Sequence, residues 1–161
     1  MATKNQNLSD YDKNTIPSAK QFRFGIVVSE WNSNITDNLL TGAKNTLMEH
    51  GALAENITTW HVPGSYELIY GSKKMQEHRV DAVIAIGCVI QGETKHFDFV
   101  CEAVSQGIKD LNVQHDTPVI FCVLTDNVMQ QSIDRSGGKH GNKGVEAAVA
   151  AIKMAVLREK A

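Results

Sequence analysis

Long apolar runs, basic charge and cysteine are all scarce in this sequence. No apolar run approaches the roughly 20 residues that a transmembrane helix needs, and the polar residues 1–14 lack the apolar core of a signal peptide. A formal net charge of -2 and a pI near 6.3 leave no basic excess for nucleic acid. We therefore expect a cytoplasmic protein that binds neither membranes nor nucleic acid.

The few cysteines also restrict the chemistry. Cys88, Cys101 and Cys122 are odd in number, and each lies in an apolar context. Reduced, packed thiols are therefore favoured over a disulfide or a metal site. The sequence contains no CxxC, no HExxH and no carboxylate cluster at ligand spacing. We predict no bound metal.

The size and organisation of the chain indicate one domain. With 161 residues, 42% of them hydrophobic, the chain can bury a sizeable core. Residues 1–20 are polar, and Pro17 argues against a helix there, so we interpret this segment as an N-terminal arm. No repeat or linker divides residues 21–161, which we interpret as a single domain.

Strand and helix patterns alternate along this domain. Buried strands are predicted at residues 22–28, 57–62, 82–86 and 118–125. Helical patterns follow, with Gly51 ending the first helix and Asn142 capping the last. A short helix is expected at about residues 128–134, before a glycine-rich turn at residues 136–144. This alternation predicts an α/β fold with a parallel sheet covered by helices on both faces.

The stretch at residues 87–96, GCVIQGETKH, carries the most chemistry. It follows an apolar run and precedes a helix whose apolar residues share one face. A strand-to-helix turn containing Gly87, Gly92 and Thr94 would present open N–H groups and the positive end of a helix dipole, which suit an anion. His96 lies next to this potential anion-binding turn. The alternative is a tight turn whose histidine merely faces solvent.

Other loops belong to the same edge of the sheet, because ligands of parallel sheets bind beyond the carboxyl ends of the strands. This rule places Trp31, Ser65 and Glu67 near residues 87–96. Trp31 could stack on a planar heterocycle or pack at the rim of the site. Glu67 could bind a polyol or an amine, or only complement the dipole of its helix.

Several residues later in the chain also allow two interpretations. Arg135 could hold a phosphate with its planar fork, or be a surface arginine that ends a short helix. Phe121 is expected in the core unless the sheet edge is a subunit interface. Lys139, His140 and Lys143 add positive charge to the glycine-rich turn, although such loop charges often have no function.

Several ordered blocks of this sequence are informative together, namely Trp31-Asn32 with Ile35-Thr36, VPGSYE, GCVIQGETKHFD, VIFCVLT and DRSGGKHGNKG. With these blocks, the chain resembles the lumazine synthase family from about Phe22 to Leu157. The resemblance implies a flavodoxin-like three-layer αβα sandwich with a four-stranded parallel sheet. It also implies a transferase that makes 6,7-dimethyl-8-ribityllumazine in the penultimate step of riboflavin biosynthesis. A non-catalytic flavin- or phosphate-binding module and a shell-forming structural protein are the alternatives.

The resemblance implies roles for individual residues. The pyrimidine and ribityl chain of 5-amino-6-(D-ribitylamino)uracil would be bound by Trp31, Ser65, Tyr66, Glu67, Cys88, Val89, Ile90, Phe121 and Lys143. The phosphate of 3,4-dihydroxy-2-butanone 4-phosphate would be bound by Glu93, Thr94 and Arg135. For Glu93 we expect the backbone amide to bind, with the carboxylate turned away. His96 would be the catalytic proton shuttle, and Phe121 would reach in from a neighbouring subunit.

The implied reaction condenses the two small-molecule substrates and releases phosphate and water. It needs no redox step, nucleophilic side chain or metal, so we expect no cofactor. The family implies homo-oligomers, namely pentamers that in many members pack into a sixty-subunit icosahedral capsid, with riboflavin synthase as a candidate partner. The chain departs from the usual family residues at Trp31, Cys88, Gln91, Gly138 and His140.

Overall fold

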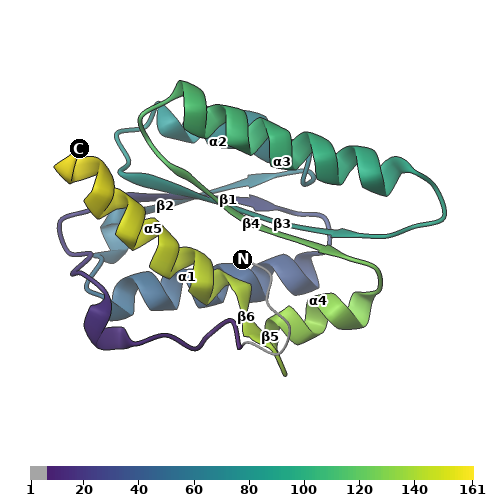
Figure 1. Ribbon diagram of the computed structural model, residues 1–161, viewed down its shortest axis with the longest axis horizontal. Helices are drawn as coiled ribbons and strands as arrows, with labels where there is room; N and C mark the ends of the chain where they lie inside the picture. The colour runs from purple at the N-terminus through teal and green to yellow at the C-terminus, as the bar shows by residue number, and fades with distance from the viewer. Residues whose placement is uncertain (1–6) are drawn as a thin grey trace.

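A parallel sheet forms the middle layer of the computed structural model, which describes residues 7–161. Its four strands are β1 (Phe24–Ser29), β2 (Ile57–Val62), β3 (Ala82–Ile90) and β4 (Val119–Asp126). The strand order is β2-β1-β3-β4, and every neighbouring pair is parallel. Helices cover both faces of the sheet (Figure 1). The predicted α/β sandwich with a four-stranded parallel sheet is thus confirmed.

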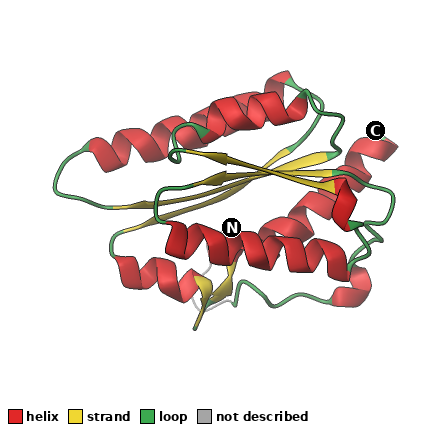
Figure 2. Ribbon diagram, turned by 180° about the vertical axis from the view of Figure 1, so that it is seen from behind, coloured by secondary structure: helices red, strands yellow, loops and turns green. Residues whose placement is uncertain are grey.

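The helices form two outer layers. In Figure 1, α2 (Leu68–Gln76) and α3 (His96–Gln114) lie above the sheet, and α1 (Ser33–Glu49) and α5 (Lys143–Lys160) lie below it. The short helix α4 (Met129–Arg135) follows β4 on the side of α1 and α5. The same three layers are seen from behind in Figure 2. Among residues 7–161, no helix is long and apolar enough to cross a membrane.

Alternate strand residues fill two separate cores, which explains the uninterrupted apolar runs in the sequence. Ile26 and Ile84 are fully buried against the layer of α1 and α5. Val27, Val83 and Ala85 point the other way and pack with α2 and α3. Strands that are buried on both faces need apolar residues at every position, because both sets of side chains leave water.

Strand β3 is longer than its apolar run predicts. The run ends at Ile86, yet the strand continues to Ile90 because residues 87–90 pair with residues 123–126 of β4. Gly87 is therefore a strand residue and not the start of a turn. A Cβ atom at Gly87 would lie 2.6 Å from Ser65 Oγ, so glycine permits the loop after β2 to pack closely against β3. The other predicted strand ends differ from the observed ones by at most two residues.

Two predicted helix signals are present, and the glycine-rich turn has additional structure. Gly51 adopts φ +96° just after α1, a conformation that favours glycine. The Asn142 side chain accepts a 2.8 Å hydrogen bond from the Gly144 amide and caps α5. Its Nδ2 also donates to the carbonyl of Asn38 in α1 at 3.0 Å. The turn itself forms a small antiparallel hairpin of β5 (Ser136–Gly138) and β6 (Gly141–Asn142).

The described part of the predicted N-terminal arm is bonded to this hairpin. The Leu8 amide donates to the His140 carbonyl at 2.7 Å, and the Asn142 amide donates to Ser9 Oγ at 2.9 Å. A short 3-10 helix (Lys13–Thr15) follows, and Ala19 is fully buried. Residues 1–6 of the predicted arm lie outside the described residues. The domain boundary at residue 20 stays a prediction.

The end of α5 is bonded to the end of the sheet at which β3 and β4 begin. Arg158 donates from Nε to Asp116 at 2.7 Å and from Nη1 to Asp81 at 3.2 Å. Asp81 also accepts a 2.7 Å hydrogen bond from the Arg23 amide, just before β1. One arginine thus joins the last helix to the segments that lead into the strands, far from the edge at which the strands end.

Candidate active site

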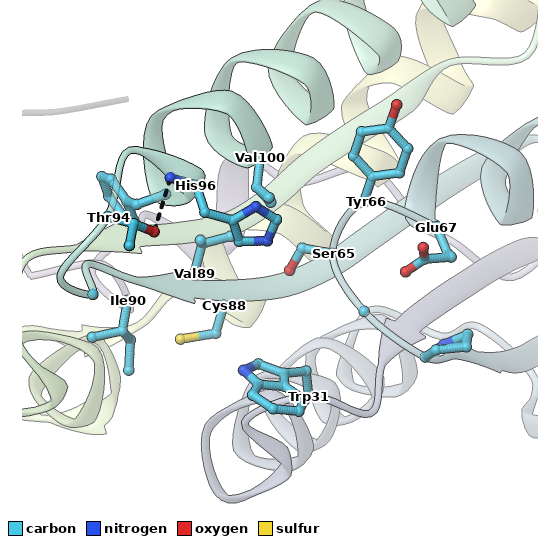
Figure 3. Close-up of a pocket in the computed structure, with 14 residues that line it drawn as sticks. Trp31, Ser65, Tyr66, Glu67, Cys88, Val89, Ile90, Thr94, His96 and Val100 are labelled. Atoms are coloured by element: carbon cyan, nitrogen blue, oxygen red, sulfur yellow. Dashed lines mark hydrogen bonds between the residues drawn. The ribbon is translucent and has the colours of Figure 1, made fainter.

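A cavity of about 710 Å³ opens where β1, β2 and β3 end. It has the size of a small-molecule site, and nine of the thirteen predicted site residues line it. These nine are Trp31, Ser65, Tyr66, Glu67, Cys88, Val89, Ile90, Thr94 and His96. Figure 3 shows Tyr66 and Glu67 toward one end, Thr94 and Ile90 toward the other, and His96 between them. The loops at the carboxyl ends of the strands therefore lie together, as the topology of a parallel sheet predicts.

The aromatic wall of the cavity comes from the loop after β1. Trp31 is 72% exposed, so most of its ring is available to a ligand. Its amide donates to the Pro63 carbonyl at 3.2 Å. The next residue, Asn32, has the left-handed φ of 60°, and its Nδ2 donates to the Cys88 carbonyl at 3.0 Å. These bonds fix the tryptophan loop to the loop after β2 and to strand β3.

The loop after β2 places polar groups at one end of the cavity. Ser65 is buried, and its Oγ has no hydrogen-bond partner within residues 7–161. Tyr66 and Glu67 are exposed on the same loop. The sequence predicts Glu67 inside the following helix, but α2 begins one residue later and Glu67 is its N-cap. A buried hydroxyl without a partner loses the hydrogen bonds it makes to water. A polar ligand in the cavity would restore them.

The floor of the cavity is the end of β3. Burial raises the pKa of the Cys88 thiol, so the thiol stays protonated at neutral pH. Cys88 therefore forms part of the cavity floor and does not act as a nucleophile. Burial also raises the pKa of Cys122, in strand β4, to about 12. All three cysteines are free thiols.

The loop between β3 and α3 offers unpaired backbone donors. In the described chain, the amides of Gly92, Glu93, Thr94 and Lys95 have no acceptor. The His96 amide donates to Thr94 Oγ1 at 3.4 Å, and the His96 side chain lines the cavity at the first residue of α3. Open amides at the positive end of a helix can bind an anion.

Four predicted site residues do not line the cavity of a single chain. Glu93 is exposed between two residues that do line it. Phe121 is 37% exposed on β4, which is an edge strand of the sheet. Arg135 ends α4, and Lys143 begins α5, where its Nζ bonds Glu146 at 2.6 Å. One chain therefore brings the aromatic, hydroxyl and histidine groups together around the cavity, whereas Arg135 and Lys143 lie outside it.

Comparison with known proteins identifies the family. The family model described as 6,7-dimethyl-8-ribityllumazine synthase matches residues 21–159. The chain belongs to this family. The predicted activity, formation of 6,7-dimethyl-8-ribityllumazine in riboflavin biosynthesis by a transferase, is thereby confirmed, as is action on small-molecule substrates.

Similar lumazine synthases span the whole chain. A 6,7-dimethyl-8-ribityllumazine synthase from Flavobacterium johnsoniae is 73% identical over 100% of this chain and 85% of its own length. One from Flavobacterium psychrophilum is 69% identical over 100% of this chain and 86% of its own length. One from Porphyromonas gingivalis is 58% identical over 98% of each chain. The alignments with the two Flavobacterium relatives therefore also include residues 1–20, which precede the part that the family model matches.

Reasoning from the sequence missed some features of this lumazine synthase cavity. Asn32 holds the tryptophan loop, and the available signal was that asparagine adopts left-handed conformations more readily than most residues. Phe97 and Val100 belong to the apolar face of α3 that the sequence pattern predicts, but they line the cavity and are only half-buried. A periodic apolar face cannot distinguish residues that contact the sheet from residues that contact a ligand.

Proposed function

We propose that the cavity is where 5-amino-6-(D-ribitylamino)uracil condenses with 3,4-dihydroxy-2-butanone 4-phosphate. The observation that supports this best is the arrangement of three different groups around one cavity. Trp31 offers an aromatic face, Ser65 offers an unpaired hydroxyl, and the loop at residues 92–95 offers open amides. The two substrates need these groups, because one has a planar ring with a polyol chain and the other has a phosphate.

The pyrimidine substrate occupies the larger part of the cavity in this proposal. Its ring stacks on Trp31, and the backbone of Cys88, Val89 and Ile90 lies along its polar edge. The ribityl chain extends toward Ser65, Tyr66 and Glu67, where hydroxyl groups can pair with Ser65 Oγ and the Glu67 carboxylate.

The phosphate substrate occupies the other end. Its phosphate accepts hydrogen bonds from the open amides near Gly92 and Thr94 and from the guanidinium of Arg135. The Glu93 carboxylate turns away, because its charge would repel the phosphate. His96, located between the two ends, is close to the atoms that exchange protons.

The chemistry requires only bond rearrangement and proton transfer. The pyrimidine amine attacks the ketone carbon, a C–N bond forms, and loss of water gives an imine. Loss of the C3 proton and departure of phosphate with the electrons of its C–O bond leave an enol, which tautomerises to a ketone at C3. The second amine closes the ring on this ketone with loss of another water. The oxidation level balances without a redox partner. The enzyme contributes mostly positioning, and His96 accepts and returns protons.

We propose further that the complete site is shared between neighbouring subunits of a cytoplasmic homo-oligomer. Phe121, Arg135 and Lys143 do not line the cavity of their own chain, and Phe121 is exposed on an edge strand. A head-to-tail ring repeats the same contact at every interface, so each chain can lend these residues to the next. A pentamer, its further assembly into an icosahedral capsid and association with riboflavin synthase belong to this proposal.

The proposed function is tested by mixing both substrates with the purified protein. We expect fluorescent lumazine and inorganic phosphate to appear in equal amounts, faster than in the spontaneous reaction. The fluorescence reports ring closure, and the phosphate reports elimination. Binding of both substrates without acceleration would instead favour the non-catalytic module.

His96→Ala should lower turnover roughly tenfold to a few hundredfold, because general acid–base catalysis contributes about that much and positioning supplies the rest. Turnover is measured at saturating concentrations of both substrates. His115→Ala is the matched control, since His115 caps the other end of α3 and should leave turnover unchanged. A His96 variant with the turnover and assembly of the unmodified enzyme would remove His96 from the mechanism.

A further inference from the structure

A chain of buried polar side chains begins at the cavity floor and ends at Arg135. The Cys88 thiol donates to Ser132 Oγ at 3.4 Å, and the Ser132 hydroxyl donates to Asp126 Oδ2 at 2.7 Å. The other carboxylate oxygen, Asp126 Oδ1, lies 3.9 Å from Arg135 Nη1. Asp126 and Ser132 have no role in the site as built above, yet within one chain they connect Cys88, which lines the chain's own cavity, to Arg135, which the shared site lends to the neighbouring subunit.

Asp126 is an unusual place for a charge, because the residue is only 8% exposed. A buried carboxylate needs hydrogen bonds and a nearby cation to offset the loss of hydration. Ser132 supplies a hydrogen bond, and Arg135 is the only cation within ion-pair distance among residues 7–161. The carboxylate is therefore matched to Arg135, which lies at the end of α4.

The contacts of Arg135 hold one corner of its guanidinium and leave the rest open. Nη1 donates to the Gln131 carbonyl at 2.9 Å and faces Asp126. Nε and Nη2 have no acceptor in the part of the chain that the structure describes. A guanidinium is a rigid plane, so a hold on Nη1 sets the direction of the other donors. This is the geometry that a forked contact with a phosphate needs.

We propose that Asp126 is a positioning residue for phosphate recognition by Arg135. The buried carboxylate, fixed by Ser132, restrains Nη1 so that Nε and Nη2 are presented together to the phosphate. This inference rests on the proposed function, which gives Arg135 the phosphate of the butanone substrate. The backbone of Asp126 contacts the chain's own cavity loop, because its carbonyl accepts the Gln91 amide at 2.9 Å where the open-amide loop begins.

Removing the charge of Asp126 should change the binding of the phosphate substrate, and the direction of this change distinguishes positioning from simple electrostatics. A carboxylate near an arginine subtracts positive charge, so removing it would by charge alone tighten the binding of an anion. If Asp126 instead orients the guanidinium, removing its charge loosens the binding of phosphate. The Michaelis constant for the phosphate substrate therefore moves in opposite directions under the two explanations.

The test uses Asp126→Asn in the assembled enzyme, which keeps the shape of the side chain and an acceptor for Ser132. We expect the KM for dihydroxybutanone phosphate to rise about two- to fivefold, in the range of a partly exposed ion pair. The KM for the pyrimidine substrate and the melting temperature should stay within error. Asp134→Asn is the matched control, because Asp134 adjoins Arg135 but bonds Gln130 and Lys139 instead.

A second background shows whether Asp126 acts through Arg135. Asp126→Asn should have no further effect on the KM for the phosphate substrate once Arg135 is alanine. A fall in that KM, an equal rise in both KM values, or an undiminished effect in the Arg135→Ala background would each overturn the inference. If Arg135→Ala alone leaves the KM unchanged, the phosphate role of Arg135 in the proposed function fails, and the inference fails with it. An effect of Arg135→Ala without one of Asp126→Asn would overturn only the inference.

Discussion

Replacing Arg135 by alanine should lower kcat/KM for dihydroxybutanone phosphate about a hundredfold, the loss expected for two charge-assisted hydrogen bonds to a phosphate. Arg135→Lys should recover only part of this loss, because an ammonium group supplies charge without the planar fork. Steady-state kinetics with the pyrimidine substrate saturating would measure both variants. Arg135→Ala also removes the cation beside the buried Asp126 carboxylate, so the melting temperature and assembly of each variant are measured together with its kinetics.

Lys139→Ala is the matched control for this prediction. Lys139 is another cation of the same region, lies on the hairpin turn and pairs with Asp134 at 3.2 Å. Its side chain is 69% exposed, so its loss should change kcat/KM less than about twofold. A lysine variant at position 135 that matches the unmodified enzyme would show that charge alone is sufficient and would contradict forked recognition.

Mixing two inactive variants should restore activity if neighbouring subunits share each site. Trp31→Ala and Phe121→Ala oligomers should each be impaired at every site. After they are unfolded together and refolded at equal ratio, about a quarter of the interfaces should combine an intact Trp31 with an intact Phe121 (one half times one half). Activity should rise toward about that fraction of the unmodified enzyme, above both parents.

The control for the mixing experiment pairs Trp31→Ala with His96→Ala. Both residues line the cavity of one chain, so no mixed oligomer contains an additional intact site. This pair should show no gain after refolding. Mass spectrometry of the intact oligomers would verify that subunits mixed in both experiments. Verified mixed oligomers of the Trp31 and Phe121 variants without a gain in activity would rule out the shared site.

The fold could be predicted from local patterns wherever the causes are local. Strand β2 occupies residues 57–62 as predicted, because Pro63 and Gly64 stop the β pattern there. The end of β3 could not be predicted, since residues 87–90 extend the strand only by pairing with β4, which lies more than thirty residues later. The hairpin of β5 and β6 likewise depends on contacts with the N-terminal segment that no periodicity reveals.

The candidate site divides in the same way. Trp31, Ser65 and His96 could be assigned to one cavity from the sequence, because the topology of a parallel sheet brings the ends of its strands together. Asp126 could not be recognised, since it reads as the polar end of a strand until folding places it beside Ser132 and Arg135. The proposed contribution of a second subunit has no signature in the periodicity of one chain.

The bonds of Arg158 have a practical consequence for attaching other proteins to this one. The last helix ends beside Asp81 and Asp116, at the end of the sheet where β3 and β4 begin (Figure 1), whereas the cavity lies where strands end. A tag or cargo domain fused after Ala161 would therefore leave from a firmly held helix, and its linker would start far from the mouth of the candidate cavity of the same chain. Fusions at this end should preserve substrate access, whereas insertions near Trp31 or Gly92 would obstruct it.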